Sequence, residues 1–320
     1  MLKKISPMLC QSQSEAFDNK NWLFEQKIDG IRIIAIKNGD KVKLLTRSGS
    51  DKAKQFPEIV EFLQKLRAKI IVLDGEVAAH KYNRSDFQAL QPRIMQNSPE
   101  EIDTLMASTP VTYYVFDLLE IDGKNWLERP VLDRKRQLKI ILSRYKDKTV
   151  QYLDHVIAKG LETYRMAKRK RWEGIIAKQI TSFYMPGKRS VDWIKLKTRS
   201  QQEFVIGGFT KGFGRAKDSL GALLVGHYVD DDLMFVGKVG TGFTDENRQV
   251  LLKKMLRLKR ANGSFLDCRA LRKERGEITW IKPELVGEFA FANWTRNKML
   301  RSPVFLGLRD DKPAKEVVDN

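Results

Sequence analysis

The chain has 320 residues, of which 42% are hydrophobic and 31% are charged, and its 59 Lys and Arg against 40 Asp and Glu give a net charge of +19. This length suits about two domains, and this composition excludes a disordered chain. The excess of basic residues is spread along the whole sequence, which favours a nucleic-acid partner over an anionic membrane.

The cysteine content and the short apolar runs argue against zinc-binding, disulfide-rich, secreted and membrane-spanning proteins. Cys10 and Cys268 are far apart and match neither a zinc site nor a disulfide scaffold, so we expect a reducing compartment. No apolar run approaches the length of a membrane span, and the first residues lack the apolar core of a secretory signal. We therefore expect a cytoplasmic protein, associated with a bacterial or viral nucleoid, that makes no contact with a membrane.

The first part of the chain alternates strand signals with turns. Strands are predicted at residues 22–26, 31–36, 41–46, 70–73, 112–118, 174–178 and 193–197. Asn38-Gly39 predicts a hairpin turn, Pro186-Gly187 predicts a loop, and the strand at 70–73 is expected to end at Asp74-Gly75-Glu76. A helix is predicted from an Asp133 cap to Tyr145, because apolar residues recur there at helical spacing.

The pattern changes after Thr198. Short strands punctuated by glycine run from Phe204 to Gly242, and one helix follows, with Thr244 as its expected cap and Leu251, Met255 and Leu258 on one face. Many short strands with glycine corners and a single helix are typical of a small barrel. We place the domain boundary near Thr198 to Ser200, which gives a first domain at 1–198 and a second at 199–320.

The most informative segment is Lys27-Ile28-Asp29-Gly30-Ile31-Arg32, which lies between two predicted strands. A lysine that attacks a phosphate needs an approachable backbone, a partner for its charge and a cation near the phosphate, and this segment offers all three. Six further segments follow in order: Leu45-Thr46-Arg47-Ser48-Gly49, Leu73-Asp74-Gly75-Glu76-Val77, Tyr114-Val115-Phe116-Asp117-Leu118, Trp172-Glu173-Gly174-Ile175-Ile176-Ala177-Lys178, Trp193-Ile194-Lys195-Leu196-Lys197 and Arg309-Asp310-Asp311-Lys312.

In this order, the seven segments resemble the motifs of ATP-dependent DNA ligases, which belong to the nucleotidyltransferase superfamily. The resemblance runs from about Met8 to Lys312 and is greatest to the ligase domain of bacterial non-homologous end-joining ligases. It implies an α+β fold: an adenylation (nucleotidyltransferase) domain of antiparallel sheets with flanking helices, followed by a C-terminal OB-fold barrel. Ile28 and Ile31 depart from the family pattern, because end-joining ligases often carry aromatic residues at these positions.

The resemblance identifies Lys27 as the nucleophile that takes AMP from ATP. Attack requires a neutral amine, and a lysine with an ordinary pKa of about 10.4 is almost entirely charged at pH 7. Neighbouring cations lower such a pKa and can also hold the α-phosphate of ATP. The candidates for both tasks are Arg32, Lys178, Lys195 and Lys197.

Two carboxylates are candidate metal ligands. Glu76 and Glu173 each lie beside a glycine next to a predicted strand, and carboxylate oxygens from separate strands can hold Mg²⁺ or Mn²⁺ together with water and phosphate. In the family, the counterpart of Glu76 also lies near the ribose, so its role is shared.

The remaining nucleotide-binding candidates follow from the resemblance. Phe116 would stack on adenine and Glu25 would lie beside that base. Arg47 and Arg189 would bind phosphate or sugar oxygens, for which the planar guanidinium is suited. Arg309 and Lys312 would close over the pyrophosphate of ATP, although a mixed-charge run near a C-terminus is more often a solvated tail.

The expected reaction seals a 5′-phosphate/3′-hydroxyl nick in duplex DNA, through lysyl-AMP and a DNA-adenylate, in DNA repair. The second domain would swing about Thr198–Gln202 between the steps. Two basic clusters would follow DNA phosphates: one is Arg165, Lys168, Arg169, Lys170 and Arg171, and the other is Arg257, Lys259, Arg260, Arg269, Arg272, Lys273 and Arg275. We expect a monomer, and the sequence leaves open recruitment by a Ku-like end-binding protein.

Two other functions compete with this interpretation. An RNA ligase or a capping-type nucleotidyltransferase also forms a lysyl-nucleotide, and the nucleotide that becomes attached to Lys27 would separate them. A non-catalytic DNA-binding scaffold could keep the fold, but Lys27, Glu76, Glu173, Lys195 and Lys197 are all present.

Overall fold

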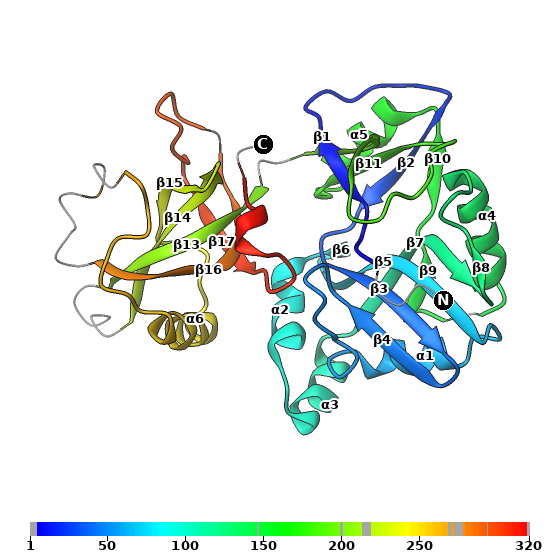
Figure 1. Ribbon diagram of the computed structural model, residues 1–320, viewed down its shortest axis with the longest axis horizontal. Coiled ribbons are helices and arrows are strands. Elements are labelled where there is room, and N and C mark those ends of the chain that lie inside the picture. Colours follow the sequence, from blue (N-terminus) through cyan, green and yellow to red (C-terminus); the bar gives the residue numbers. More distant parts are fainter. Residues whose placement is uncertain are drawn as a thin grey trace. The chain divides into compact units, whose positions relative to one another are not determined.

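The computed structural model describes residues 5–145, 147–198, 201–212, 219–267, 271, 278–292 and 294–318 (Figure 1). The chain divides into two compact units, Met1–Thr198 and Arg199–Asn320, and each is described by itself. Cys268 and residues 199–200 of the expected hinge lie outside the described residues. In the described part of the chain, we find no helix with the length and apolar character needed to cross a bilayer.

The first sheet of unit 1 carries the Lys27 segment at the end of one of its inner strands. Its strand order is β1-β12-β11-β2-β10, and all the pairings are antiparallel except β1 with β12. The bounds are Leu9–Ser12 for β1, Trp22–Lys27 for β2, His155–Ile157 for β10, Gly174–Gln179 for β11 and Arg189–Lys197 for β12. The strands predicted at 22–26, 174–178 and 193–197 are therefore confirmed.

The second sheet of unit 1 has the order β4-β3-β5-β7-β8, with β6 and β9 attached to β5 and β7. The bounds are Ile31–Asn38 for β3, Lys41–Leu45 for β4, Ile70–Lys81 for β5, Arg84–Ser85 for β6, Val111–Ile121 for β7, Lys124–Asn125 for β8 and Val150–Tyr152 for β9. The predicted β3–β4 hairpin is confirmed. Its two-residue turn is Gly39-Asp40, because Asn38 still pairs with Lys41.

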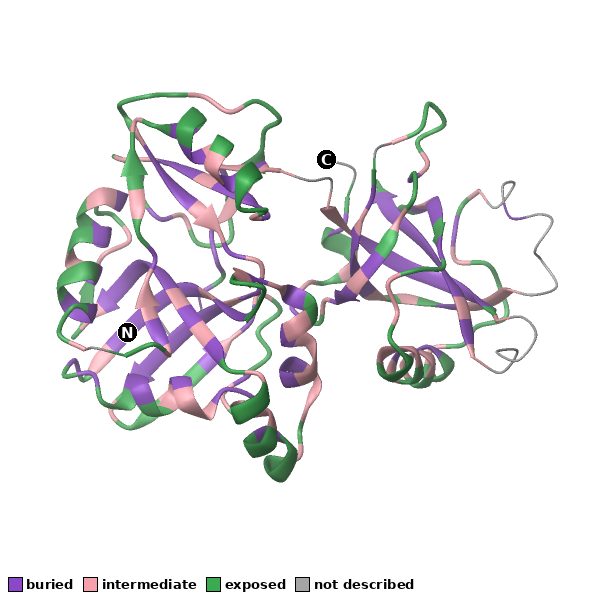
Figure 2. Ribbon diagram, turned by 180° about the vertical axis from the view of Figure 1, so that it is seen from behind, coloured by how far each residue is buried: buried purple, intermediate pink, exposed green. Residues whose placement is uncertain are grey.

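The helices of unit 1 cover one face of the second sheet and the outer face of the first. The bounds are Pro57–Gln64 for α1, Phe87–Met95 for α2, Pro99–Ser108 for α3, Val131–Leu142 for α4 and Gly160–Arg169 for α5. One buried cluster lies between the second sheet and α1, α2 and α4, and a second lies between the two sheets. Figure 2 shows the buried residues along the strands and the exposed residues on helices and loops.

Two expectations about local structure are wrong. Strand β5 does not end at Asp74-Gly75-Glu76 but continues to Lys81, because Gly75 leaves room for the Tyr113 ring and the buried Asp74 carboxylate is paired. Helix α4 begins at Val131 after Pro130, so Asp133 lies in its first turn and does not cap it. An acidic residue in the first turn is still favourable, because its negative charge interacts with the positive end of the helix dipole.

Unit 2 contains an antiparallel sheet with the order β15-β14-β13-β16-β17. The bounds are Gln201–Lys211 for β13, Leu220–Val229 for β14, Asp232–Val239 for β15, Ile278–Ala290 for β16 and Val304–Leu308 for β17, with a short 3₁₀ turn at Ala314–Glu316. Helix α6 spans Asp245–Arg257, and Thr244 caps it through a reciprocal capping box with Asn247, as predicted. Leu251 and Met255 are buried, which also confirms the predicted apolar face.

Candidate active site

Lys27, Glu173 and Lys197 meet where three inner strands of the first sheet, β2, β11 and β12, have their ends. In the strand register, Gly174 on β11 lies opposite Lys27 on one side and Lys197 on the other, and Glu173 directly precedes it. The Lys27 Nζ lies 2.6 Å from Glu173 Oε2, and the Lys197 Nζ lies 3.4 Å from Glu173 Oε1. Gly174 permits this arrangement, because a Cβ there would lie 2.2 Å from the Leu196 carbonyl oxygen.

The exposure of these three side chains differs. The Glu173 side chain is 4% exposed, whereas those of Lys27 and Lys197 are 23% and 24% exposed. One carboxylate therefore faces two ammonium groups, and the two lysines bring like charges to the same place. Of the cations expected around Lys27, the structure brings Lys197 to the same carboxylate.

Glu25 and Lys195 lie one step further along the same face of the sheet. Both are opposite Ile176 of β11, so residues 25 and 27 of β2 and residues 195 and 197 of β12 share this face. Lys195 is partly exposed, but Glu25 is only 2% exposed. The sheet register therefore places four of the predicted site residues on one surface.

The Glu25 carboxylate lies between two buried ammonium groups. Lys135 on α4 contacts Glu25 Oε1 and also donates to the Leu153 carbonyl oxygen at 2.9 Å, and Lys178 Nζ lies 2.8 Å from Glu25 Oε2. Burial alone would raise the pKa of Glu25, but Lys135 and then Lys178 hold it below its ordinary value. Burial lowers the pKa of Lys135, although Glu25 opposes that shift. Lys135 is not among the residues predicted for the site.

Lys178 lies at the Phe116 end of this surface, away from Lys27. Its Nζ is 4.4 Å from the centroid of the Phe116 ring and 4.1 Å from that of Trp193. Phe116 occupies a bulge, because Gly75 pairs with Val115 and Asp74 pairs with Asp117, so the register passes over Phe116. The bulge brings the 9%-exposed Phe116 into the cluster between the sheets.

Arg32 is held by a buried carboxylate. Its Nε and Nη2 donate to Asp74 Oδ1 and Oδ2 at 2.9 and 2.6 Å, and the Tyr184 hydroxyl donates to Asp74 Oδ2 at 2.7 Å. Burial would lower the pKa of Arg32, but Asp74 raises it well above its ordinary value. The Arg32 guanidinium carbon is 5.2 Å from the Phe116 centroid, so Arg32 lies near the base end of the site as well.

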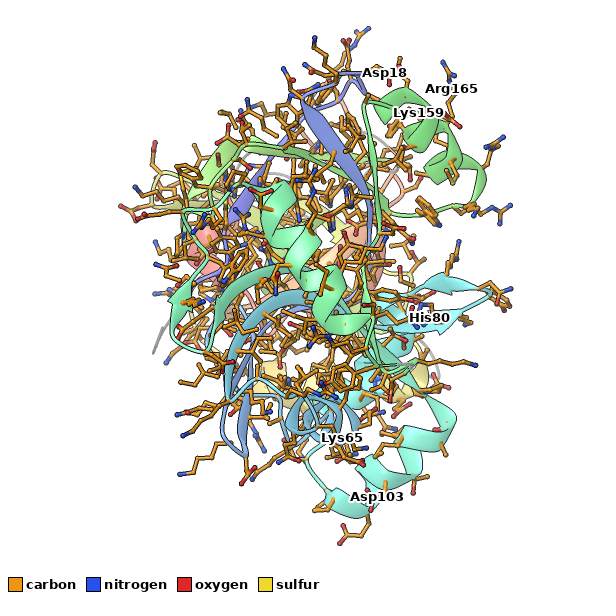
Figure 3. All side chains as sticks on the ribbon, turned by 90° about the vertical axis from the view of Figure 1, so that its right-hand side faces the viewer. Asp18, Lys65, His80, Asp103, Lys159 and Arg165 are labelled. Atoms are coloured by element: carbon orange, nitrogen blue, oxygen red, sulfur yellow. The ribbon has the colours of Figure 1, made fainter. Side chains whose placement is uncertain are left out.

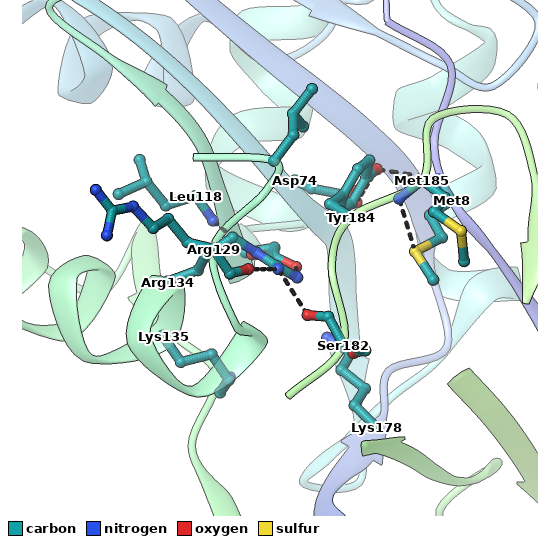
Figure 4. A network of polar contacts seen from close by, with 12 residues as sticks. Met8, Asp74, Leu118, Arg129, Arg134, Lys135, Lys178, Ser182, Tyr184 and Met185 are labelled. Atoms are coloured by element: carbon teal, nitrogen blue, oxygen red, sulfur yellow. Dashed lines mark hydrogen bonds and ion pairs between the residues drawn. The ribbon is translucent and has the colours of Figure 1, made fainter. Parts of the chain in front are cut away.

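A second buried pair lies beside this one and joins α4 to the sheet. Arg134 Nε and Nη2 donate to the two oxygens of Asp117 at 2.7 and 2.8 Å, and Arg134 Nη1 donates to the Ser182 carbonyl oxygen at 3.1 Å. Figure 4 shows how Arg134 reaches Ser182 and how Tyr184 reaches Asp74. Both ends of the Arg134–Asp117 pair are fully buried.

Glu76 and Glu173 are the two carboxylates that the sequence predicts as metal ligands. Glu76 is partly exposed on β5, opposite Arg32 and Tyr114. Among the described residues, no group of three or more His, Cys, Asp or Glu side chains is gathered for a metal. The donor set fits Mg²⁺ or Mn²⁺, which commonly bind through one or two carboxylates and complete their coordination with water and phosphate.

Arg47 and Arg189 lie on loops and strand ends around the same unit. Arg47 follows β4 in a turn closed by the Gly49 N–H donating to the Thr46 carbonyl oxygen at 2.9 Å. Arg189 begins β12, is exposed and donates from Nη1 to the Cys10 carbonyl oxygen at 2.5 Å. That bond joins the start of β12 to its parallel neighbour β1.

Arg309 and Lys312 lie in unit 2, where both are engaged by carboxylates. Arg309 makes a bidentate contact with Asp311 at 2.8 Å and a further contact with Glu288 at 3.0 Å, and Lys312 Nζ lies 2.7 Å from Glu203 Oε2. Burial would lower the pKa of Arg309, but Asp311 and Glu288 raise it well above its ordinary value. This segment is therefore an ordered part of unit 2 and not a solvated tail.

Comparisons with known proteins match most of the chain to one family. Residues 7–197 match the family model described as "ATP dependent DNA ligase domain", and residues 216–312 match "ATP dependent DNA ligase C terminal region". Among curated proteins, the multifunctional non-homologous end joining protein LigD of Mycolicibacterium smegmatis is 33% identical over 98% of this chain, and DNA ligase 2 of Methanosarcina acetivorans is 30% identical over 99%. The chain spans only 39% and 56% of the length of these two relatives.

A solved structure covers both units. The structure titled "mycobacterial DNA ligase D complexed with ATP and MES" is 30% identical, with a TM-score of 0.69 over 99% of this chain and 98% of that chain. The predicted α+β fold, with an adenylation domain followed by an OB-fold domain, is thereby confirmed. The chain belongs to the ATP-dependent DNA ligase family.

Proposed function

We propose that this chain seals nicks in duplex DNA in three steps. Lys27 attacks the α-phosphate of ATP, so that a P–N bond forms and pyrophosphate leaves. The 5′-phosphate of the nick then takes AMP from Lys27, and finally the 3′-hydroxyl attacks that phosphate and AMP leaves. Each step is a displacement at phosphorus that depends on positioning and on neutralisation of charge.

The observation that carries this proposal is the contact of Lys27 and Lys197 with the single carboxylate of Glu173. The sheet fixes all three residues, because they lie on or next to one row of paired strands. A nucleophilic amine, a second cation and a buried carboxylate in one place are the groups that adenylate transfer requires. Lys195, on the same face, adds a further cation for the phosphates.

Glu173 and Glu76 would hold Mg²⁺ or Mn²⁺. When bound, the cation would neutralise the charge that develops on the phosphate oxygens. Glu173 is already buried and faces two ammonium groups, so the chain itself supplies positive charge at this carboxylate.

The base end of the site is formed by Phe116, Glu25 and Lys178. Phe116 would stack on adenine. An ionised Glu25 accepts hydrogen bonds and donates none, so it would favour a base that carries a donor, such as the amino group of adenine. We keep Arg32, Arg47 and Arg189 as phosphate and sugar ligands, and Arg309 and Lys312 as ligands of the pyrophosphate. These roles, the division at Thr198 into a catalytic and an OB-fold domain, and the swing between steps are part of the proposal.

The DNA surface would include the C-terminal end of α5. Arg165, Lys168, Arg169, Lys170 and Arg171 are all exposed there, and the run ends two residues before Glu173. Cations in such a row suit phosphate contacts that follow the backbone without reading sequence. Of the second basic cluster, Arg257, Lys259 and Arg260 are exposed, whereas Arg269, Arg272, Lys273 and Arg275 lie outside the described residues.

The partner class follows from the relatives. Several of them are named as non-homologous end joining proteins, which supports a role in DNA repair. Recruitment by a Ku-like end-binding protein is the partner that we propose for such a role. We propose that the chain acts as a monomer on nicked duplex DNA in the cytoplasm.

Incubation with labelled ATP, Mg²⁺ and a nicked duplex tests the proposal directly. We expect a gain of one AMP mass on the protein, mapped to Lys27, followed by joining of the strand. Lys27→Ala should lose both. Attachment of GMP would indicate a capping-type enzyme, joining of RNA nicks alone would indicate an RNA ligase, and failure to acquire adenylate would contradict the proposal.

A further inference from the structure

The hairpin formed by β5 and β6 presents an exposed tyrosine in a strained conformation. His80 pairs with Ser85 and Lys81 with Arg84, which leaves Tyr82-Asn83 as a two-residue turn. Both turn residues have positive φ, 52° at Tyr82 and 57° at Asn83. Glycine and asparagine adopt this conformation easily, but a bulky residue does so at a cost of about 1–2 kcal/mol. Tyr82 is nevertheless 83% exposed, so it buries little surface in return.

The base of this hairpin is fixed on both strands. The Ser85 hydroxyl accepts a hydrogen bond from the Asp29 N–H at 3.0 Å, and the Tyr114 hydroxyl lies 2.8 Å from His80 Nε2. Partial burial lowers the pKa of His80. Figure 3 shows the hairpin, in cyan beside the labelled His80, extending outward from unit 1. The tip therefore projects from a base that hydrogen bonds attach to the rest of the unit.

The bond from Asp29 to Ser85 joins this hairpin to the loop of the nucleophile. Asp29 is two residues from Lys27, and Tyr82 is three residues from Ser85. At about 3.3 Å per residue, the tip lies about 10 Å along the strand from Ser85. A duplex carries about one phosphate charge per 1.7 Å of its axis, so DNA with its nick at Lys27 would still present several phosphates at this distance.

The charge of the tip matches such a partner. The exposed Lys81 places its Nζ 5.5 Å from the centroid of the Tyr82 ring, and the partly exposed Arg84 is paired across the hairpin from Lys81. The nearest carboxylate in sequence, Asp86, is used to cap α2 by accepting from the Ala89 N–H. Two cations and a tyrosine hydroxyl are donors suited to phosphate and sugar oxygens.

We propose that the Lys81-Tyr82-Asn83-Arg84 tip contacts the sugar–phosphate backbone of duplex DNA beside the nick, and that this contact is why a tyrosine occupies a position suited to asparagine or glycine. This inference rests on the proposed ligase function and names one of its DNA-binding surfaces. Strain at an exposed residue is retained where the surrounding structure and a binding partner use it.

Tyr82→Asn tests the proposal, because it relieves the strain and removes the aromatic ring together. We expect the thermal midpoint of unit 1 to rise by about 2–4 °C. Affinity for a nicked duplex with a non-reactive 3′ end should fall at least about 5-fold, while the rate of lysyl-AMP formation without DNA stays at the parent value. An unchanged DNA affinity, or a lower thermal midpoint, would overturn the proposal.

Lys81→Met separates charge from strain. It should reduce the slope of log affinity against log salt by about 0.9, the value for one phosphate contact. Lys65→Met at the C-cap of α1 removes the same charge from an exposed lysine and should leave the slope at the parent value. An unchanged slope in Lys81→Met would also overturn the proposal. A parent protein that acquires no adenylate would instead contradict the ligase function itself.

Discussion

Lys27 and Glu173, which are 146 residues apart in the chain, meet at 2.6 Å between Nζ and Oε2. The pairing of β2 with β11 makes this contact, since Gly174 lies opposite Lys27. A carboxylate so close favours the charged amine, yet attack on phosphorus needs the neutral one. We therefore expect Glu173 to do more than hold Lys27 in place, because that role alone would oppose the proposed attack.

Glu173→Gln separates two roles of this carboxylate, which are to stabilise the charged Lys27 amine and to organise cations around the phosphate. If Glu173 only stabilised the charged amine, the variant would form lysyl-AMP faster near pH 7. We expect the opposite, a fall of at least about 100-fold across pH 6–9, because the carboxylate also organises cations around the phosphate. The rate is measured with labelled ATP and Mg²⁺. Glu162→Gln, an exposed carboxylate on α5, should keep the parent rate.

Lys135→Met tests whether the buried lysine sets the choice of base. Lys135 and Lys178 hold the pKa of Glu25 below its ordinary value against the opposing effect of burial, so Glu25 is an acceptor only. Without Lys135, we expect KM for ATP to rise about 10-fold and the preference for ATP over ITP to fall, because a protonated Glu25 can donate to the hypoxanthine carbonyl.

Lys135→Arg provides the matching rescue. It retains a cation beside Glu25 and should restore most of the preference for ATP over ITP. Steady-state adenylation with each nucleotide gives both ratios. An equal loss of activity with ATP and ITP in Lys135→Met would mean that Lys135 acts on folding alone.

Two arginines on α4 give a matched test of stability. Arg134 is fully buried with Asp117, so Arg134→Met leaves an unpaired buried carboxylate and should lower the free energy of unfolding by about 3–5 kcal/mol. Arg136 pairs with Asp133 at 3.2 Å, but its side chain is 68% exposed, so Arg136→Met should change that free energy by less than about 0.5 kcal/mol. Urea unfolding measures both. Equal effects would contradict the structure of this helix.

Because the pKa of His155 is lowered, we expect the free energy of unfolding to decrease in mild acid. Burial, with a smaller effect from Lys135, lowers its pKa to about 4. The unfolded chain, with a histidine pKa of about 6.5, binds more protons than the native state between these values. The free energy of unfolding therefore carries no penalty from His155 above about pH 6.5, and it decreases as the pH falls toward 4. After allowance for solvent, we expect a loss of about 1–2 kcal/mol between pH 7 and 5.

His155→Gln is the control for that prediction. It removes the titrating group and keeps a polar partner for Tyr152, whose hydroxyl lies 3.0 Å from His155 Nδ1. Urea unfolding at pH 7 and pH 5 should show a smaller pH-dependent loss in this variant. If parent and variant lose the same free energy, His155 does not titrate as described.

The strands were predictable from sequence because most of them carry contiguous apolar or alternating residues. The capped helix α6 was predictable for the same reason, since Thr244 and its apolar face are both local signals. The continuation of β5 through Asp74-Gly75 was not, because an acidic residue followed by glycine is a turn signal. Arg32, brought alongside by pairing of β3 with β5, and the Tyr184 hydroxyl make that carboxylate acceptable inside a strand.

Lys135 and Arg134 show why part of the site escaped prediction. Both lie in the charged run Asp133-Arg134-Lys135-Arg136, and such a run, taken alone, is typical of a solvated face. Helical spacing could have identified Lys135 as buried, because it lies on one face of α4 with the apolar Val131, Leu138 and Leu142, and all four are buried. The carboxylates that accept these cations come from distant strands, and no local pattern identifies them.

The position of Lys178 has a consequence for inhibitors of this enzyme. Its Nζ lies 4.4 Å from the centroid of Phe116, 4.1 Å from that of Trp193 and 2.8 Å from Glu25 Oε2, so a cation borders the aromatic surface on which adenine is proposed to stack. A compound that brings a second positive group to this surface meets the like charge of Lys178. Neutral flat heterocycles with a hydrogen-bond donor toward Glu25 should therefore bind more tightly than cationic analogues of the same size.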